Sequence, residues 1–179
     1  EMSSELCALH RANFPRTRVV RSAATPTNVW PLLAPLIAEL EGDDAAAKLY
    51  EYFGAFNAKD VVEVANHIYS TPVHIAGGDS HLVLANPDAA IRNLVGLYGE
   101  IEAQGWKESV IEDLKICQAS DTLALVDARY SRIDHDGNPI PPTIRTTLYV
   151  LQKIDRVWRI VAFYGHAADK RPSCGPVQP

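Results

Sequence analysis

The spacing of the apolar residues changes at Trp106, and this change constrains the fold more than any other feature of the 179-residue chain. Before Trp106 the apolar side chains mostly recur at intervals of three and four, which is the spacing of an amphipathic helix. After it they recur at every second position, which is the spacing of a strand. Short turns connect four strand-like runs, at 106–118, 121–134, 143–154 and 156–165. The second half therefore predicts an antiparallel meander.

The first half predicts helices that have clear start signals. Asp60, with Glu63 three residues later, resembles a capping box. Asn86 followed by Pro87 is typical of the first turn of a helix. The expected elements are, in order, a helix over 44–57 capped by Asp43, a helix over 60–69, short strands at 73–76 and 81–85, and a helix from Pro87 to just before Gly105.

Helices followed by an antiparallel meander predict an α+β fold, with three helices packed on one face of a curved, mainly antiparallel sheet. Helices cannot fill the concave side of such a sheet completely, so we expect a cone-shaped cavity, and cavities of this kind are common ligand sites. The domain would span 43–166. An N-terminal arm, 1–42, with a short helix at 31–41 would precede it, and a C-terminal tail, 167–179, would follow.

Composition argues against several classes of partner. The formal net charge is −5 and the isoelectric point is about 5.6, which argues against nucleic acid. No apolar run approaches the roughly 20 residues of a membrane span, so we expect no membrane partner and a cytoplasmic location. The three cysteines are widely spaced and form no Cys-x-x-Cys pair, which indicates neither a disulfide framework nor a zinc motif. No grouping of His, Asp and Glu has metal-ligand spacing, so we expect no metal and no cofactor.

Two runs of the sequence carry a resemblance to a known family. Residues 49–60 (LYEYFGAFNAKD) end in an Asn-x-x-Asp pattern, and residues 150–161 (VLQKIDRVWRIV) look like a closing β-hairpin. Together with the order of elements over about 44–166, they resemble the NTF2-like superfamily, which includes SnoaL-like polyketide cyclases and ketosteroid isomerase. Arg156 or Val157 stands where the family's hairpin usually has glycine. The resemblance implies the α+β cone fold, but this fold hosts many activities.

The resemblance also implies positions for a site. Tyr52 falls where ketosteroid isomerase carries the tyrosine of its oxyanion hole, a phenol that donates a hydrogen bond to a developing enolate. The isomerase's catalytic base would fall near His74 or Ile75, where no aspartate stands. His74 could replace that base, or it could be a structural histidine. The second oxyanion donor would fall near Tyr149 or Leu148, again without the acid, and we expect Tyr149 to bind substrate.

Strand alternation adds candidates. Along the run 121–134, Asp127 and Arg129 share one face. Alignment with the family pattern turns this face toward the cavity, where Asp127 would be catalytic and Arg129 would bind substrate. The alternative is a structural ion pair. The same alignment turns Tyr164 of the last strand inward as a further substrate-binding residue. Tyr98, on the apolar stripe of the third helix, is expected to bind substrate as well.

Two functions fit these residues. The first is a cofactor-independent acid–base enzyme, an isomerase, cyclase or dehydratase acting on a largely apolar organic molecule. In this enzyme Tyr52 and Tyr149 would polarise an oxygen while His74 or Asp127 moves a proton. The second is a non-catalytic ligand-binding or dimerisation module, which the missing isomerase acids favour. In either case we expect a homodimer, because the outer face of the meander would otherwise expose a broad apolar surface.

Overall fold

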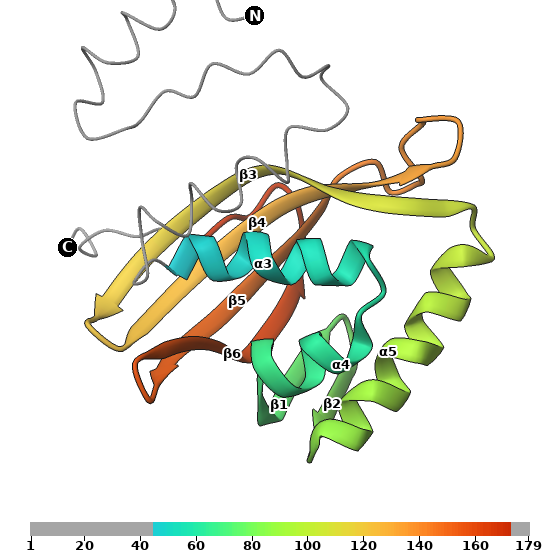
Figure 1. Ribbon diagram of the computed structural model, residues 1–179. Helices are drawn as coiled ribbons and strands as arrows, with labels where there is room; N and C mark the ends of the chain where they lie inside the picture. The colour runs from blue at the N-terminus through green and yellow to red at the C-terminus, as the bar shows by residue number, and fades with distance from the viewer. Residues whose placement is uncertain (1–44, 173–179) are drawn as a thin grey trace, which may run out of the picture. The chain divides into compact units, whose positions relative to one another are not determined.

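The computed structural model describes residues 45–172, which form three helices and a six-stranded mixed sheet (Figure 1). The expected arm at 1–42, with its helix at 31–41, lies outside the described residues. In chain order the elements are α3 (Ala45–Asn57), α4 (Val61–Glu63), its π-helical continuation η2 (Val64–Ile68), β1 (Tyr69–Gly77), β2 (Ser80–Leu84), α5 (Pro87–Glu102), β3 (Trp106–Ser120), β4 (Leu123–Asp134), β5 (Arg145–Ile154) and β6 (Val157–His166).

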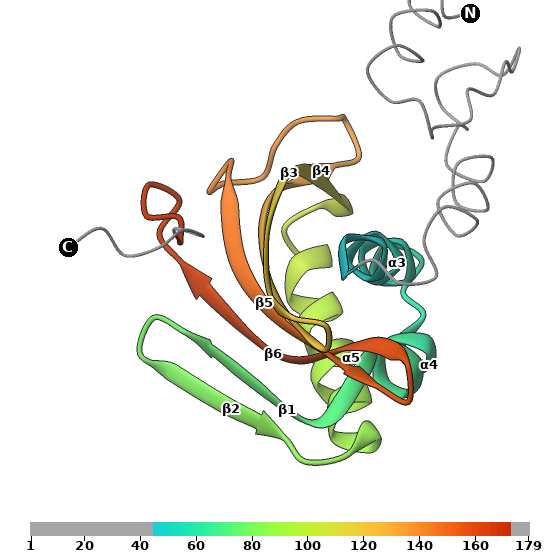
Figure 2. The ribbon, with the colours of Figure 1, turned by 90° about the vertical axis from the view of Figure 1, so that its left-hand side faces the viewer.

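The expected α+β architecture is confirmed. The strands lie in the order β2-β1-β6-β5-β4-β3, and all neighbours are antiparallel except β1 and β6, which are parallel. The four strands after α5 form the expected meander. Figure 2 shows that the sheet is curved and that α3 and α5 lie on the same side of it. This side is concave, and the helices only partly cover it.

Local sequence signals explain where the helices begin and which face they bury. The Asn86 side chain accepts a hydrogen bond from the backbone N–H of Ala89 at 2.9 Å, which caps α5. Asp60 caps α4 in the same way, with the backbone N–H of Glu63 at 2.9 Å. The buried residues of each long helix recur at helical spacing and pack on the sheet. They are Ala45, Leu49, Tyr52, Phe53 and Phe56 on α3, and Ala90, Leu94, Tyr98 and Ile101 on α5.

A bulge in β6 determines which of its side chains face the helices. Ile160 pairs with Leu151 and Ala162 pairs with Val150, so Val161 is an extra residue in β6. Because successive side chains of a strand point to opposite faces, the extra residue exchanges the two faces. Even-numbered side chains of β6 face the helices before the bulge, and odd-numbered side chains face them after it.

On β4 the even-numbered side chains face the helices throughout. Ala124, Val126 and Ala128 have no exposed surface. The ring of Tyr130 lies edge-on to Phe53 of α3, with ring centroids 5.3 Å apart. The odd-numbered side chains of β4 therefore lie on the opposite, outer face of the sheet.

The described residues also bear on membrane crossing and on the state of one cysteine. Among residues 45–172, none of the helices is both long enough and apolar enough to cross a bilayer. Cys117, on β3, is disulfide-bonded in this structure. The wide spacing of the cysteines in the sequence gives no sign of this bond.

Candidate functional site

A cavity of about 450 Å³ lies between the helices α3 and α5 and the concave face of the sheet. This volume is in the range of small-molecule sites. Every strand of the sheet and both long helices contribute to its lining. The lining residues are Tyr52, Phe53, Phe56, Tyr69, Ile75, Leu82, Arg92, Asn93, Leu94, Gly96, Leu97, Glu100, Ser109, Tyr130, Arg132, Thr147, Tyr149 and Phe163.

Seven aromatic side chains, from α3, β1, β4, β5 and β6, line the cavity. The ring of Tyr52 on α3 lies at the centre of this aromatic wall, 5.8 Å from the ring of Tyr69 on β1 and 5.7 Å from that of Tyr149 on β5. Phe163 on β6 stands beside both Tyr69 and Tyr149, with ring centroids 5.9 and 5.7 Å away. Such walls suit a flat apolar molecule, because rings pack favourably edge-on or offset against other rings.

The hydroxyl groups of the three tyrosines converge. The Tyr69 hydroxyl donates a hydrogen bond to the Tyr52 hydroxyl at 3.3 Å. The Tyr52 hydroxyl thus accepts one bond from the protein and keeps its own proton for a second partner. That partner can be Tyr149 or a ligand atom.

Burial keeps these phenols protonated. It raises the pKa of Tyr52 to about 12, although the Tyr69 hydroxyl and the Arg132 charge act in the opposite direction. Burial also raises the pKa values of Tyr69 and Tyr149 well above the ordinary value, since a phenolate is poorly solvated there. At neutral pH the cluster can therefore donate hydrogen bonds to a ligand oxygen but cannot act as a base.

The other polar groups of the cavity come from β3, β4, β5 and α5. Ser109 and Arg132 are cross-strand neighbours on β3 and β4, and Thr147 lies beside Tyr149 on β5. Glu100, exposed on α5, is the one carboxylate among the described lining residues, which include no histidine and no cysteine. Residues 45–172 hold no group of three or more potential metal ligands. The cavity offers donors and positive charge rather than metal ligands.

The structure brings together only two of the seven residues proposed from the sequence. Tyr52 and Tyr149 line the cavity and lie next to each other. Their catalytic and substrate-binding roles stay predictions, as do the expected homodimer and the cytoplasmic location.

The expectation that Asp127 and Arg129 face the cavity is wrong. Both lie on the odd-numbered, outer face of β4. The Asp127 carboxylate, 1% exposed, is held there by His166 Nε2 at 2.6 Å and by Arg171 Nε. Arg129 instead lies 3.7 Å from Glu112 of β3. Asp127 thus belongs to a structural ion pair, which was the alternative interpretation, though with other partners than Arg129.

The expectation that His74 and Tyr164 face the cavity is also wrong, because in each case a neighbouring residue of the same strand takes the inward position. On β1, Ile75 lines the cavity, so its neighbour His74 points to the outer face, where it is exposed and its ring stacks on His81 at 5.8 Å. Tyr164 follows the β6 bulge, which gives Phe163 the inward position. The Tyr164 side chain is 39% exposed on the outer face.

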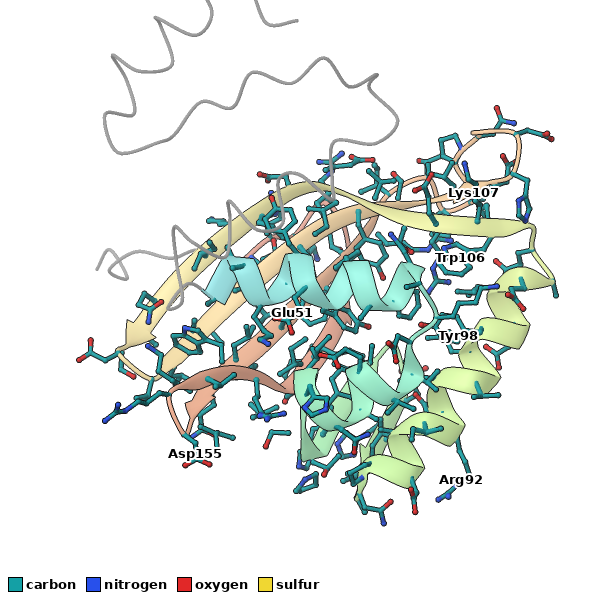
Figure 3. The ribbon with its side chains drawn as sticks, in the orientation of Figure 1. Glu51, Arg92, Tyr98, Trp106, Lys107 and Asp155 are labelled. Carbon is teal, nitrogen blue, oxygen red and sulfur yellow. The ribbon has the colours of Figure 1, made fainter. Side chains whose placement is uncertain are left out.

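Tyr98 lies behind the cavity wall instead of lining it. Its hydroxyl donates a hydrogen bond to the backbone carbonyl of Phe56 at 2.8 Å. Its ring packs between Phe56 and Trp106, at centroid distances of 4.9 and 5.8 Å, and Figure 3 shows Tyr98 and Trp106 close together where α5 meets β3. Tyr98 therefore fixes the end of α3 to α5 and has no donor left for a ligand.

The sequence interpretation missed eight polar residues of the cavity. They are Tyr69, Arg92, Asn93, Glu100, Ser109, Tyr130, Arg132 and Thr147. One signal was available for two of them. Between Leu123 and Ser131 the even-numbered positions carry only apolar and aromatic side chains, whereas the odd-numbered positions include two charged ones, and an apolar face indicates the side that packs on the core. Following that face would have placed Tyr130 and Arg132 inward.

A curved sheet with helices on its concave side and a cavity between them is the architecture of NTF2-like proteins. The sequence of residues 43–168 matches the family described as NTF2-like protein (DUF6841). The chain belongs to this family, and the resemblance found in the sequence is confirmed. No curated protein matches the sequence.

Solved structures show the same fold. The chain is similar to an NTF2-like protein with a cystatin-like fold from Novosphingobium aromaticivorans, at 12% identity over 86% of this chain and 96% of that chain, with a TM-score of 0.57. It is similar to an NTF2-like protein from Shewanella oneidensis MR-1, at 16% identity over 69% and 96% of the two chains, with a TM-score of 0.53. A ketosteroid isomerase-like protein from Erwinia carotovora atroseptica shares 16% identity over 70% and 94%, with a TM-score of 0.52. At these identities the similarity shows the fold alone.

Proposed function

We propose that this protein binds a small, largely apolar organic molecule in the cavity between α3, α5 and the sheet. The observation that carries the proposal is the combination of aromatic walls with converging hydrogen-bond donors in a space of about 450 Å³. Apolar walls supply most of the binding free energy in such sites, and a few polar groups fix the orientation. Here the walls would hold a ring system, and the hydroxyls of Tyr52 and Tyr149 would bind an oxygen atom of the ligand.

The test is a titration with N-phenyl-1-naphthylamine, a neutral dye that fluoresces when it enters an apolar cavity. The wild-type chain should bind it at a single saturable class of site. Leu97→Trp fills the α5 side of the cavity and should weaken binding at least about tenfold, which corresponds to about 1.4 kcal/mol. Val95→Trp is the matched control, because Val95 lies on the same helix, does not line the cavity and is 57% exposed. Equal binding by Leu97→Trp and wild type would contradict the proposal.

Acid–base catalysis is the second candidate function, as an isomerase, cyclase or dehydratase. It is supported by the protonated Tyr52 at the position that the resemblance assigns to an oxyanion tyrosine, and by the ketosteroid isomerase-like description of one structural neighbour. The proton acceptor cannot be His74 or Asp127, which lie on the outer face. Glu100 is the carboxylate of the lining, so it takes this role in the second candidate.

Proton exchange distinguishes the two functions. In D₂O, an enzyme of this type should accelerate deuterium incorporation at the carbon next to the carbonyl of 2-tetralone, an aromatic ketone, as followed by NMR. Glu100→Gln should remove the acceleration and leave binding of the fluorescent dye intact. Dye binding without any accelerated exchange would leave ligand binding as the function and contradict the enzyme.

A further inference from the structure

Arg132 lines the cavity and has a buried donor atom that the described part of the fold leaves without a partner. It projects from β4 on the same face as Tyr130, opposite Ser109 of β3. Its Nε atom is enclosed by protein and has no hydrogen-bond partner among the described residues. A buried donor of this kind is rare in folded proteins, and it is more unfavourable on a charged group than on a neutral one.

Other arginines of the domain are satisfied by the chain itself. Arg145 donates to backbone carbonyls in the loop before β5, at 2.6 to 3.0 Å. Arg159 donates to the carbonyl of Asn66 at 2.8 Å, and Arg171 binds the Asp127 carboxylate. The free Nε of Arg132 is therefore not a general property of arginines in this fold. It occurs where the side chain reaches the cavity.

The surroundings of Arg132 suit a negatively charged group. Burial raises the pKa values of Tyr52 and Tyr149, and the positive charge of Arg132 opposes that rise, so its electric field reaches both hydroxyls. An oxyanion between the guanidinium and these hydroxyls would accept bonds from both sides. The guanidinium fork fits a carboxylate especially well, because two parallel N–H groups match its two oxygens.

We propose that the ligand is an organic anion, with a flat apolar body between the aromatic walls and a carboxylate on Arg132. This inference rests on the proposed ligand-binding function and names the class of molecule that the site takes. The aromatic walls alone would accept neutral and charged molecules of the same shape. Arg132 supplies the preference for the charged one.

Competition against N-phenyl-1-naphthylamine tests the preference with a pair of ligands that differ in charge. 2-Naphthoate carries the carboxylate, and its methyl ester has the same rings without the charge. Wild-type protein should release the dye at a concentration of 2-naphthoate at least about tenfold lower than that of the ester. Arg132→Met should lose this difference, so that 2-naphthoate and the ester release the dye at concentrations within about twofold of each other.

The matched control is Arg129→Met, which removes the same charge from the same strand but on the outer face. It should keep the full preference for 2-naphthoate. Arg132→Gln provides a second variant if the methionine variant does not fold, which far-UV circular dichroism would show. If wild type binds the dye but prefers the ester or neither ligand, or if both Arg132 variants keep the preference for 2-naphthoate, the anion inference is overturned and the binding function stands. If wild type does not bind the dye, the binding function itself fails.

Discussion

Replacing Arg132 by methionine should stabilise the unliganded protein, although it removes a charged residue from a folded domain. The Nε atom of Arg132 is buried without a partner, and an unsatisfied buried donor costs about 1–3 kcal/mol. Methionine follows the arginine side chain only as far as the Nε position, carries no donor there, and adapts its shape to neighbouring side chains. We therefore expect the free energy of unfolding to rise by about 1–2 kcal/mol. Binding sites commonly sacrifice stability for function in this way.

Urea denaturation at neutral pH measures the change. Arg129→Met is again the control, because Arg129 forms a partly exposed ion pair with Glu112 at 3.7 Å, and such pairs contribute about 0–1 kcal/mol. The control should lose up to that amount, whereas Arg132→Met should gain stability with an unchanged dependence on urea concentration. A loss of more than about 1 kcal/mol in Arg132→Met would refute the reasoning, because it would show that the guanidinium is well paired in the free protein.

Tyr98→Phe removes one of the two donors to the Phe56 carbonyl and leaves the backbone N–H of Lys59 at 3.0 Å as the other, so it should lower the free energy of unfolding by about 0.5–1.5 kcal/mol, with dye affinity unchanged. The free energy of unfolding should fall between about pH 10 and about pH 12. In this range the unfolded chain loses the Tyr52 proton at the ordinary pKa, while the folded chain keeps it until the pH reaches its raised pKa of about 12. Tyr52→Phe should reduce this fall by about 2 kcal/mol, as measured by urea denaturation across the same pH range. Arg156 has a φ of 67° in the β5–β6 turn, so Arg156→Gly should raise the thermal midpoint, through a gain of about 0.5–1 kcal/mol.

The elements of this fold could be predicted because their signals are local. The cap at Asn86, the apolar stripe of α3 and the alternation after Trp106 each depend on residues a few positions apart. The resemblance assigned Tyr52 to the position of an oxyanion tyrosine, and in the structure Tyr52 is buried on α3 and lines the cavity. Sequence reasoning thus reached the cavity and the tyrosine at its centre.

The wrong placements come from strand parity, which is not a local property. Strict alternation along β6 would put Tyr164 on the same face as Trp158. The single extra residue Val161 exchanges the two faces, so Tyr164 lies on the outer face instead. Pairing with β5 produces this bulge, and no residue type in β6 marks it. For Asp127 the error was of another kind. The family pattern turns Asp127 inward, whereas the apolar side chains on the opposite face of β4 correctly indicate the inward side.

The partners of Asp127 illustrate a further limit. Its carboxylate is paired with His166 and Arg171, 39 and 44 residues away in the chain. A buried carboxylate needs partners, but a sequence does not say which cations the fold brings to it. For the same reason the sequence does not show that Arg132 Nε is buried without a hydrogen-bond partner from the described residues.

Both proposals require that the space between α3, α5 and the sheet is a ligand site. A crystal structure of the protein grown with saturating 2-naphthoate tests this claim most directly. We predict that the naphthalene rings lie between Tyr52, Tyr149 and Phe163, with a carboxylate oxygen within hydrogen-bonding distance of Arg132 Nε. A structure in which the cavity holds no ligand, or in which 2-naphthoate is bound only on the outer face of the sheet, would contradict the account.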